Sequence, residues 1–235
     1  MRLTDRIAVV TGAAGGPGGA VARAFAREGA RLVLADTDDA KGEVIAEEIT
    51  ARSGKTRFVH CDVASRLDVR KLIARTLDLF DRIDIIVNAA LLEAAGAALE
   101  LKEDVFETAL HAGLLGPFLL AQAAARQMAS QGTDGAPAKP YLILNVARQP
   151  QRRGAAVSAS FGGLMRLTGA LAREFGPLGV RVNLLRVEST EGTDALDAIA
   201  RAALFLASDV GADVTGQRLT PAGALALAGT PDGAP

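Results

Sequence analysis

The chain of 235 residues has few of the side chains that build disulfides and metal centres. Cys61 is the only cysteine, so an internal disulfide and a thiolate metal site are both excluded. The two histidines, His60 and His111, are far apart and lack the spacing of metal ligands. We therefore predict no metal site and interpret His60 and Cys61 as residues at the end of a strand.

An excess of charge and a long apolar run are also absent. The 26 Lys and Arg residues balance 27 Asp and Glu residues, so no global field attracts nucleic acid or an anionic membrane. No uncharged apolar run reaches the roughly 18 residues that a membrane span needs. Residues 1–5 lead directly into an apolar strand without the apolar region of a signal peptide. We expect a soluble cytoplasmic protein without nucleic-acid or membrane partners.

Apolar runs of strand length alternate with longer stretches of helical periodicity. This alternation predicts a single-domain Rossmann fold over residues 1–228, a doubly wound parallel sheet of about seven strands with helices on both faces. The tail 229–235 is expected to be frayed. The expected strands are 6–11, 31–36, 57–61, 83–88, 141–146, 181–185 and 217–220. The expected helices are 17–28, 39–53, 66–80, 104–128, 158–175 and 195–208.

A glycine-rich turn, Thr11-Gly12-Ala13-Ala14-Gly15-Gly16-Pro17-Gly18, joins the first strand to the first helix. Gly12, Gly16 and Gly18 suit a turn whose backbone approaches a pyrophosphate, and Pro17 is tolerated in the first helical turn. The helix N-terminus supplies free N–H groups. The turn indicates a dinucleotide site. The alternative is that the glycines only permit a tight turn and helix–strand packing.

Polar residues at the ends of the next strands strengthen the dinucleotide hypothesis. Asp36 ends the second strand, about where an acid binds the ribose hydroxyls of adenosine. Asp62 and Val63 follow the third strand, and Asn88 ends the fourth. Because an acid at position 36 repels a 2′-phosphate, NAD is favoured over NADP if either binds.

Motifs along nearly the whole chain together resemble the classical short-chain dehydrogenase/reductase family. They are Thr11-Gly12 with Gly16 and Gly18, Asp62-Val63, Gly116-Pro117-Phe118, Ser158-Ala159-Ser160, Gly162-Gly163, Arg181-Val182-Asn183, Leu204-Phe205-Leu206-Ala207-Ser208-Asp209 and Val214-Thr215-Gly216-Gln217. The resemblance implies the Rossmann fold, a nicotinamide cofactor and oxidoreductase chemistry.

The same resemblance implies four catalytic groups whose positions hold other residues here. Val157 stands where the family has its acid/base tyrosine, and Phe161 where it has the lysine that binds the nicotinamide ribose. The serine position falls on Ala147 or Arg148, and the asparagine position on Gly113. Val157 has no proton to give. The resemblance therefore implies a degenerate member that lacks the catalytic tetrad and binds NAD weakly or not at all.

Further departures concern the space around the cofactor. Leu91 ends the segment Asn88-Ala89-Ala90-Leu91, where the family's backbone passes close to the cofactor. Val187-Glu188 replaces the family's Pro-Gly, and only a short link remains where a substrate lid usually follows. Tyr141, the only tyrosine, precedes the fifth strand, at the end of the sheet opposite the ligand crevice.

Other polar residues are weaker candidates. Ser158 and Ser160 are interpreted as capping and opening a helix rather than as nucleophiles, because no histidine is placed to act as their base. The arginines of the loop after the fifth strand are interpreted as solvated, with anion binding as the alternative. They are Arg148, Arg152 and Arg153. Two acids are predicted on crevice-side loops, where neither has a visible acid/base partner. We interpret His111 as a packing or surface residue. The acids are Glu93 and Glu188.

The helices 104–128 and 158–175 carry more apolar residues than one face against the sheet needs. In the resembled family the matching helices form a subunit interface; ordinary core helices are the alternative. The favoured hypothesis is a non-catalytic structural or regulatory subunit, paired with an active NAD-dependent paralogue for which hydroxyacyl-CoA dehydrogenases are the candidate class. The alternatives are a divergent NAD-dependent oxidoreductase acting on an alcohol/ketone pair and an NAD-sensing binding module.

Overall fold

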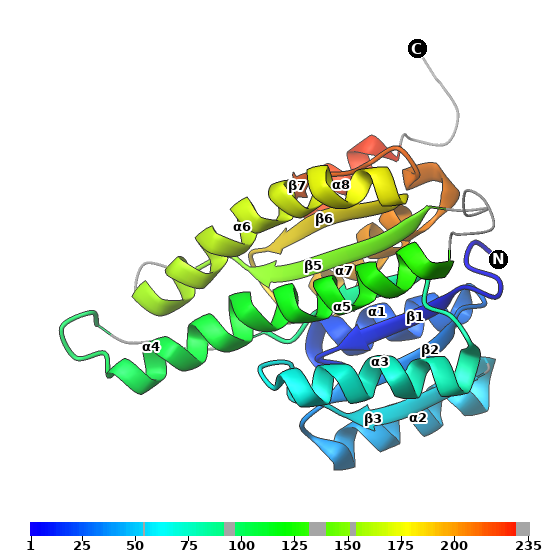
Figure 1. The fold of residues 1–235 in the computed structure, drawn as a ribbon, viewed down its shortest axis with the longest axis horizontal. Helices are drawn as coiled ribbons and strands as arrows, with labels where there is room; N and C mark the ends of the chain where they lie inside the picture. The colour runs from blue at the N-terminus through cyan, green and yellow to red at the C-terminus, as the bar shows by residue number, and fades with distance from the viewer. Residues whose placement is uncertain (54, 92–96, 132–139, 151–153, 229–235) are drawn as a thin grey trace.

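The computed structural model describes residues 1–53, 55–91, 97–131, 140–150 and 154–228. Within these ranges, seven strands form one parallel sheet in the order β3-β2-β1-β4-β5-β6-β7 (Figure 1). Their bounds are β1 (Ile7–Thr11), β2 (Arg31–Asp36), β3 (Thr56–His60), β4 (Ile85–Asn88), β5 (Tyr141–Arg148), β6 (Val180–Val187) and β7 (Arg218–Leu219). The strand order reverses between β1 and β4, which places a ligand crevice at their carboxyl ends.

Helices cover both faces of the sheet, so the predicted doubly wound Rossmann fold is confirmed. Their bounds are α1 (Gly16–Arg27), α2 (Asp39–Ser53), α3 (Arg66–Phe80), α4 (Glu103–Leu110), α5 (Gly116–Gln131), α6 (Ala155–Phe175), α7 (Thr193–Ala207) and α8 (Pro221–Leu227). One core cluster joins the sheet to α1, α2, α7 and α8, and the other joins it to α3, α5 and α6. Apolar burial on both faces explains why the central strands are apolar throughout.

The predicted long helix 104–128 is interrupted. A π-helical segment, η1 (His111–Leu115), lies between α4 and α5. Figure 1 shows α4 and the first turns of α6 projecting beyond the carboxyl ends of the strands. Single π-turns inside α-helices often occur at functional sites. Here the π-turn contains Gly113, one of the positions that the family resemblance singles out.

Several boundaries differ from the prediction. β3 lies one residue earlier than 57–61, and β5 and β6 each continue beyond 146 and 185. The helix α6 begins at Ala155, with Gly154 as its N-cap, so the predicted capping by Ser158 and Ser160 is wrong. The helix α8 was not expected; Thr220 caps it by accepting a 3.0 Å hydrogen bond from the Gly223 amide.

The segment Glu103–Gln131 is long and apolar enough to cross a membrane by length and composition alone. However, α5 packs on the sheet, and its Leu120 and Ala124 are fully buried in the core. The core helix of a soluble protein passes the same test. We therefore interpret this segment as a core helix. The tail expected at 229–235 lies outside the described residues.

The end of the sheet opposite the crevice is held by buried polar groups. Tyr141 begins β5 there and is 2 % exposed, which confirms its predicted distance from the crevice. Arg181 donates hydrogen bonds to the carbonyl oxygens of Leu206 and Gly211, and burial lowers the pKa of its guanidinium to about 10. The Arg181-Val182-Asn183 motif is therefore structural in this chain.

Candidate functional site: the crevice at the strand ends

The glycine-rich turn packs its backbone directly against the end of β4. Gly12 has a φ of +64°, and a Cβ there would overlap the Ala89 carbonyl oxygen. A Cβ on Gly18 would overlap the Gly12 carbonyl oxygen and lie 2.7 Å from its carbon. By contrast, a Cβ on Gly15 or Gly16 would meet nothing within 4 Å. Packing therefore requires glycine at positions 12 and 18, whereas the space beside Gly15 and Gly16 is open.

This open space belongs to the outer cavity, which has a volume of about 420 Å³. It is lined by Gly12, Gly15, Gly16, Pro17, Asp36, Thr37, Cys61, Asp62, Val63, Ala89, Ala90, Leu91, Ala112 and Thr190. The outer cavity thus brings together the predicted cofactor residues Gly12, Gly16, Pro17, Asp36, Asp62 and Val63. Gly18 does not line it and packs instead against the backbone of Gly12. The first turn of α1 has no acidic residue and no side-chain cap, so its positive end is not neutralised.

Asp36 is fixed in place by backbone amides. Its Oδ2 accepts a 2.9 Å hydrogen bond from the Ala14 amide, and its Oδ1 accepts bonds from the amides of Thr37 and Asp38. The carboxylate therefore fastens the glycine-rich turn to the end of β2 while it lines the outer cavity. A carboxylate held this way is suited to accept hydrogen bonds from ribose hydroxyls and repels a phosphate at the same place.

The two residues after β3 also line the outer cavity. Cys61 is 2 % exposed, and burial raises the pKa of its thiol to about 12, so it is not a nucleophile. The Asp62 carboxylate accepts a 2.9 Å hydrogen bond from the Ala64 amide. His60, the last residue of β3, is exposed. Its Nδ1 lies 2.7 Å from Asp39 Oδ1, and this contact raises the pKa of the imidazole. The prediction that His60 and Cys61 lie at a strand end is consistent with these positions.

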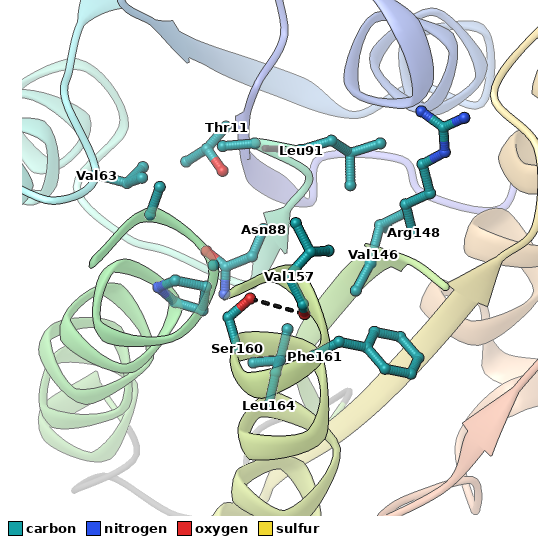
Figure 2. A pocket seen from close by; sticks show the side chains of 15 residues that line it. Thr11, Val63, Asn88, Leu91, Val146, Arg148, Val157, Ser160, Phe161 and Leu164 are labelled. Atoms are coloured by element: carbon teal, nitrogen blue, oxygen red, sulfur yellow. Dashed lines mark hydrogen bonds between the residues drawn. The ribbon is translucent and has the colours of Figure 1, made fainter. Parts of the chain in front are cut away.

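Beyond Leu91 the crevice narrows to the inner cavity, which has a volume of only about 40 Å³. It is lined by Thr11, Val63, Asn88, Ala90, Leu91, Ala112, Gly113, Pro117, Val146, Ala147, Arg148, Val157, Ser160, Phe161 and Leu164. Figure 2 shows Val157, Ser160 and Phe161 near the start of α6, with Ser160 and Phe161 on opposite sides of the helix, and Leu91, in the segment after β4, across from Val157. The four positions that the family resemblance marks as catalytic therefore meet at this cavity.

The Ser160 side chain occupies the space that a side chain at position 113 would need. A Cβ on Gly113 would lie 2.8 Å from Ser160 Oγ. Ser160 is 5 % exposed, and its hydroxyl donates a 3.1 Å hydrogen bond to the Val157 carbonyl oxygen (Figure 2). An asparagine side chain at position 113 would therefore require Ser160 to move. The π-turn here contains a glycine at this position.

A buried chain of hydrogen bonds lies below the inner cavity and was not predicted. Asn88 Nδ2 donates a 2.8 Å bond to Asn145 Oδ1, and Asn145 Nδ2 donates a 3.1 Å bond to Thr168 Oγ1. Asn145 is 1 % exposed and Thr168 is fully buried. The chain links β4, β5 and α6, which makes Asn88 a structural residue as well as a lining residue. The sequence signal was an asparagine within the apolar strand YLILNVA.

The weaker candidates do not form a second site within the described residues. Arg148 ends β5, and in Figure 2 its side chain extends away from Ser160 and Phe161. Glu188 is exposed in the short link before α7. Arg152, Arg153 and Glu93 lie outside the described residues. Where the structure describes the chain, no group of three or more His, Cys, Asp and Glu side chains is arranged to hold a metal.

An apolar groove, the helix groove, runs between α6 and the helices α4 and α5, and has a volume of about 530 Å³. It is lined by Leu110, His111, Leu114, Leu115, Phe118, Gly163, Arg166, Leu167 and Ala170. A Cβ on Gly163 would lie 2.8 Å from the Leu114 side chain, so glycine permits the close approach of the helices. His111 faces this groove rather than the inner cavity.

The parallel sheet, the glycine-rich turn and the outer cavity define an α/β protein of the dinucleotide-binding class. The sequence profile of the short chain dehydrogenase family matches residues 6–203, and the chain belongs to that family.

Relatives and solved structures agree with this assignment. A (2S)-[(R)-hydroxy(phenyl)methyl]succinyl-CoA dehydrogenase subunit, BbsD, of Thauera aromatica is 32 % identical over 97 % of this chain and 99 % of its own. The D-threitol dehydrogenase of Mycolicibacterium smegmatis is 35 % identical, covering 93 % of this chain and 92 % of its own. A short chain dehydrogenase from Mycobacterium smegmatis, with a crystal structure, has a TM-score of 0.84 at 26 % identity, covering 93 % of this chain and 92 % of that one.

Proposed function

We propose that this chain is a non-catalytic member of the short chain dehydrogenase family that serves as a structural or regulatory subunit beside an active, NAD-dependent paralogue. One observation carries the proposal. Arg148 is the only ionisable side chain among the described residues that line the inner cavity, and a guanidinium stays protonated in proteins. These described lining residues therefore offer no titrating group to give or take a proton during hydride transfer.

The hydroxyl and amide groups of the inner cavity do not fill this role. The Ser160 hydroxyl donates to a carbonyl oxygen of its own helix, and Asn88 donates to Asn145. Neither side chain titrates at neutral pH, and the described part of the cavity lining contains no lysine to acidify one of them. Divergent chemistry on an alcohol/ketone pair would therefore need the substrate or water to carry the proton.

The helix groove supports association with another chain. Leu115 is 37 % exposed in it, beside Leu114 and Phe118, and the groove is walled by two long helices. An apolar surface of this kind gains free energy when it is covered. A paralogue with matching helices is the partner we propose. The relative BbsD, named as a subunit of a hydroxy(phenyl)methylsuccinyl-CoA dehydrogenase, supports a hydroxyacyl-CoA dehydrogenase as the class of that partner. We place the complex in the cytoplasm.

Co-expression with a family paralogue that retains the catalytic tyrosine and lysine tests the proposal. We expect one complex by light scattering and native mass spectrometry. Leu115→Glu is expected to release the partner without changing the melting temperature of this chain. Leu227→Glu, at an equally apolar residue that is 57 % exposed on α8, is the matched control and should leave the complex intact. Recovery of this chain only as a homo-oligomer would contradict the proposal.

A further inference from the structure

We infer that the crevice binds the adenosine diphosphate half of a dinucleotide and excludes the nicotinamide half. The inference comes from the contrast between the two cavities and does not depend on the proposed partner. The outer cavity of about 420 Å³ is open to solvent beside Gly15 and Gly16. The inner cavity, at the positions where the family carries out its chemistry, has about one tenth of that volume.

The outer cavity has the groups that recognise a nucleoside diphosphate. The amides of the glycine-rich turn and the uncapped start of α1 lie on one side, where they suit phosphate oxygens. On the other side, the Asp36 carboxylate is held by three backbone amides and suits the two hydroxyls of an unmodified ribose. Asp62 adds an acceptor for an exocyclic amino group such as that of adenine. The residues present therefore fit adenosine diphosphate.

The inner cavity does not fit the nicotinamide half. A water molecule needs at least about 10–15 Å³ of such a volume, so about 40 Å³ holds about three waters. A pyridine ring that bears a carboxamide is far larger. Phe161 is 8 % exposed on α6 and lines the inner cavity together with Leu164. Val157, also on α6, and Leu91, in the segment after β4, line the same space.

Calorimetric titration of the purified chain tests the inference directly, using ADP, ADP-ribose, NAD, NADP and nicotinamide mononucleotide. We expect ADP-ribose and NAD to bind with the same dissociation constant within about threefold, and nicotinamide mononucleotide not to bind. NADP should bind at least about tenfold more weakly than NAD, because its 2′-phosphate meets Asp36. Bound NADH should keep the fluorescence spectrum of the free molecule, since its dihydronicotinamide stays in water.

A reopened inner cavity provides the matched variant. Leu91→Gly with Phe161→Ala is expected to tighten NAD at least about tenfold relative to ADP-ribose, with ADP unchanged. Leu99→Gly, at a fully exposed leucine outside the crevice, should change neither ratio. If the double variant does not fold, the wild-type comparison of NAD with ADP-ribose decides alone. Tighter binding of NAD than of ADP-ribose by tenfold, or no binding of ADP, would overturn the inference.

These outcomes are separate from those of the co-expression experiment. The titrations use the chain without a partner and read binding rather than turnover. A chain that binds ADP but never associates with a paralogue would contradict the proposed function and support the inference. A chain that forms the complex but binds no nucleotide would support the proposed function and contradict the inference.

Discussion

Alanine at Gly15 and at Gly18 should have opposite effects on stability, although both glycines belong to one turn. At Gly18 the new Cβ would overlap backbone atoms of Gly12 that cannot rotate away. Overpacking costs about 1–3 kcal/mol, and a rigid backbone wall favours the upper end. Because Gly18 lies inside α1, alanine regains about 1 kcal/mol of helix propensity. We expect the free energy of unfolding to fall by about 2 kcal/mol, which lowers Tm by about 4–8 °C in a chain of this size.

At Gly15 the same substitution meets open space, and its φ of 179° is extended backbone that any residue adopts. Alanine there restricts the unfolded chain and should raise the free energy of unfolding by about 0.4–1 kcal/mol. Its methyl group would stand in the outer cavity, so ADP binding should weaken by about tenfold. Thermal melts of both variants, each with and without ADP, measure the two effects. Equal loss of Tm in both variants would refute the packing argument, and full ADP affinity in Gly15→Ala would refute the placement of the phosphates.

Three further outcomes follow from other contacts. The thiol of Cys61, with its pKa raised to about 12, should react with a disulfide reagent at pH 8 only after guanidinium unfolds the chain; fast labelling of the native chain would show an open site. The pKa of His60, raised mainly by Asp39, should exceed its usual value of about 6.5 in an NMR titration and fall towards that value in Asp39→Asn. The stabilisation from this pair is then full below about pH 6.5 and is lost as pH rises through the raised pKa of the folded state. Asn145→Ala removes the acceptor of the buried Asn88 amide and should cost about 1–3 kcal/mol by chemical denaturation, whereas an unchanged free energy of unfolding would contradict this role.

The sheet and its helices were predictable because apolar strand runs and helical periods are local signals. The strand β2 and the helix α3 match their predicted bounds, since Asp36 ends one and Ser65 caps the other. The turn residues Gly12 and Gly16 were also placed correctly, because a positive φ beside a strand end favours glycine.

The missed features depend on contacts between distant segments. The π-turn at His111–Leu115 leaves the apolar pattern of the long helix nearly unchanged, so the sequence showed one continuous helix. The bond from Asn145 to Thr168 joins residues on different elements, and no local pattern encodes it. The size of the inner cavity depends on how Leu91 and Phe161 pack across the crevice, which is a tertiary property.

The central claim, that no group in the inner cavity moves a proton beside a nicotinamide, is tested most directly by turnover. The assay uses the chain purified free of paralogues and follows NADH absorbance with a panel of alcohols, ketones and hydroxyacyl thioesters. We predict no rate above that of buffer, both for the wild type and for Gly16→Val. Sustained turnover at an ordinary dehydrogenase rate, abolished by Gly16→Val, would contradict the claim.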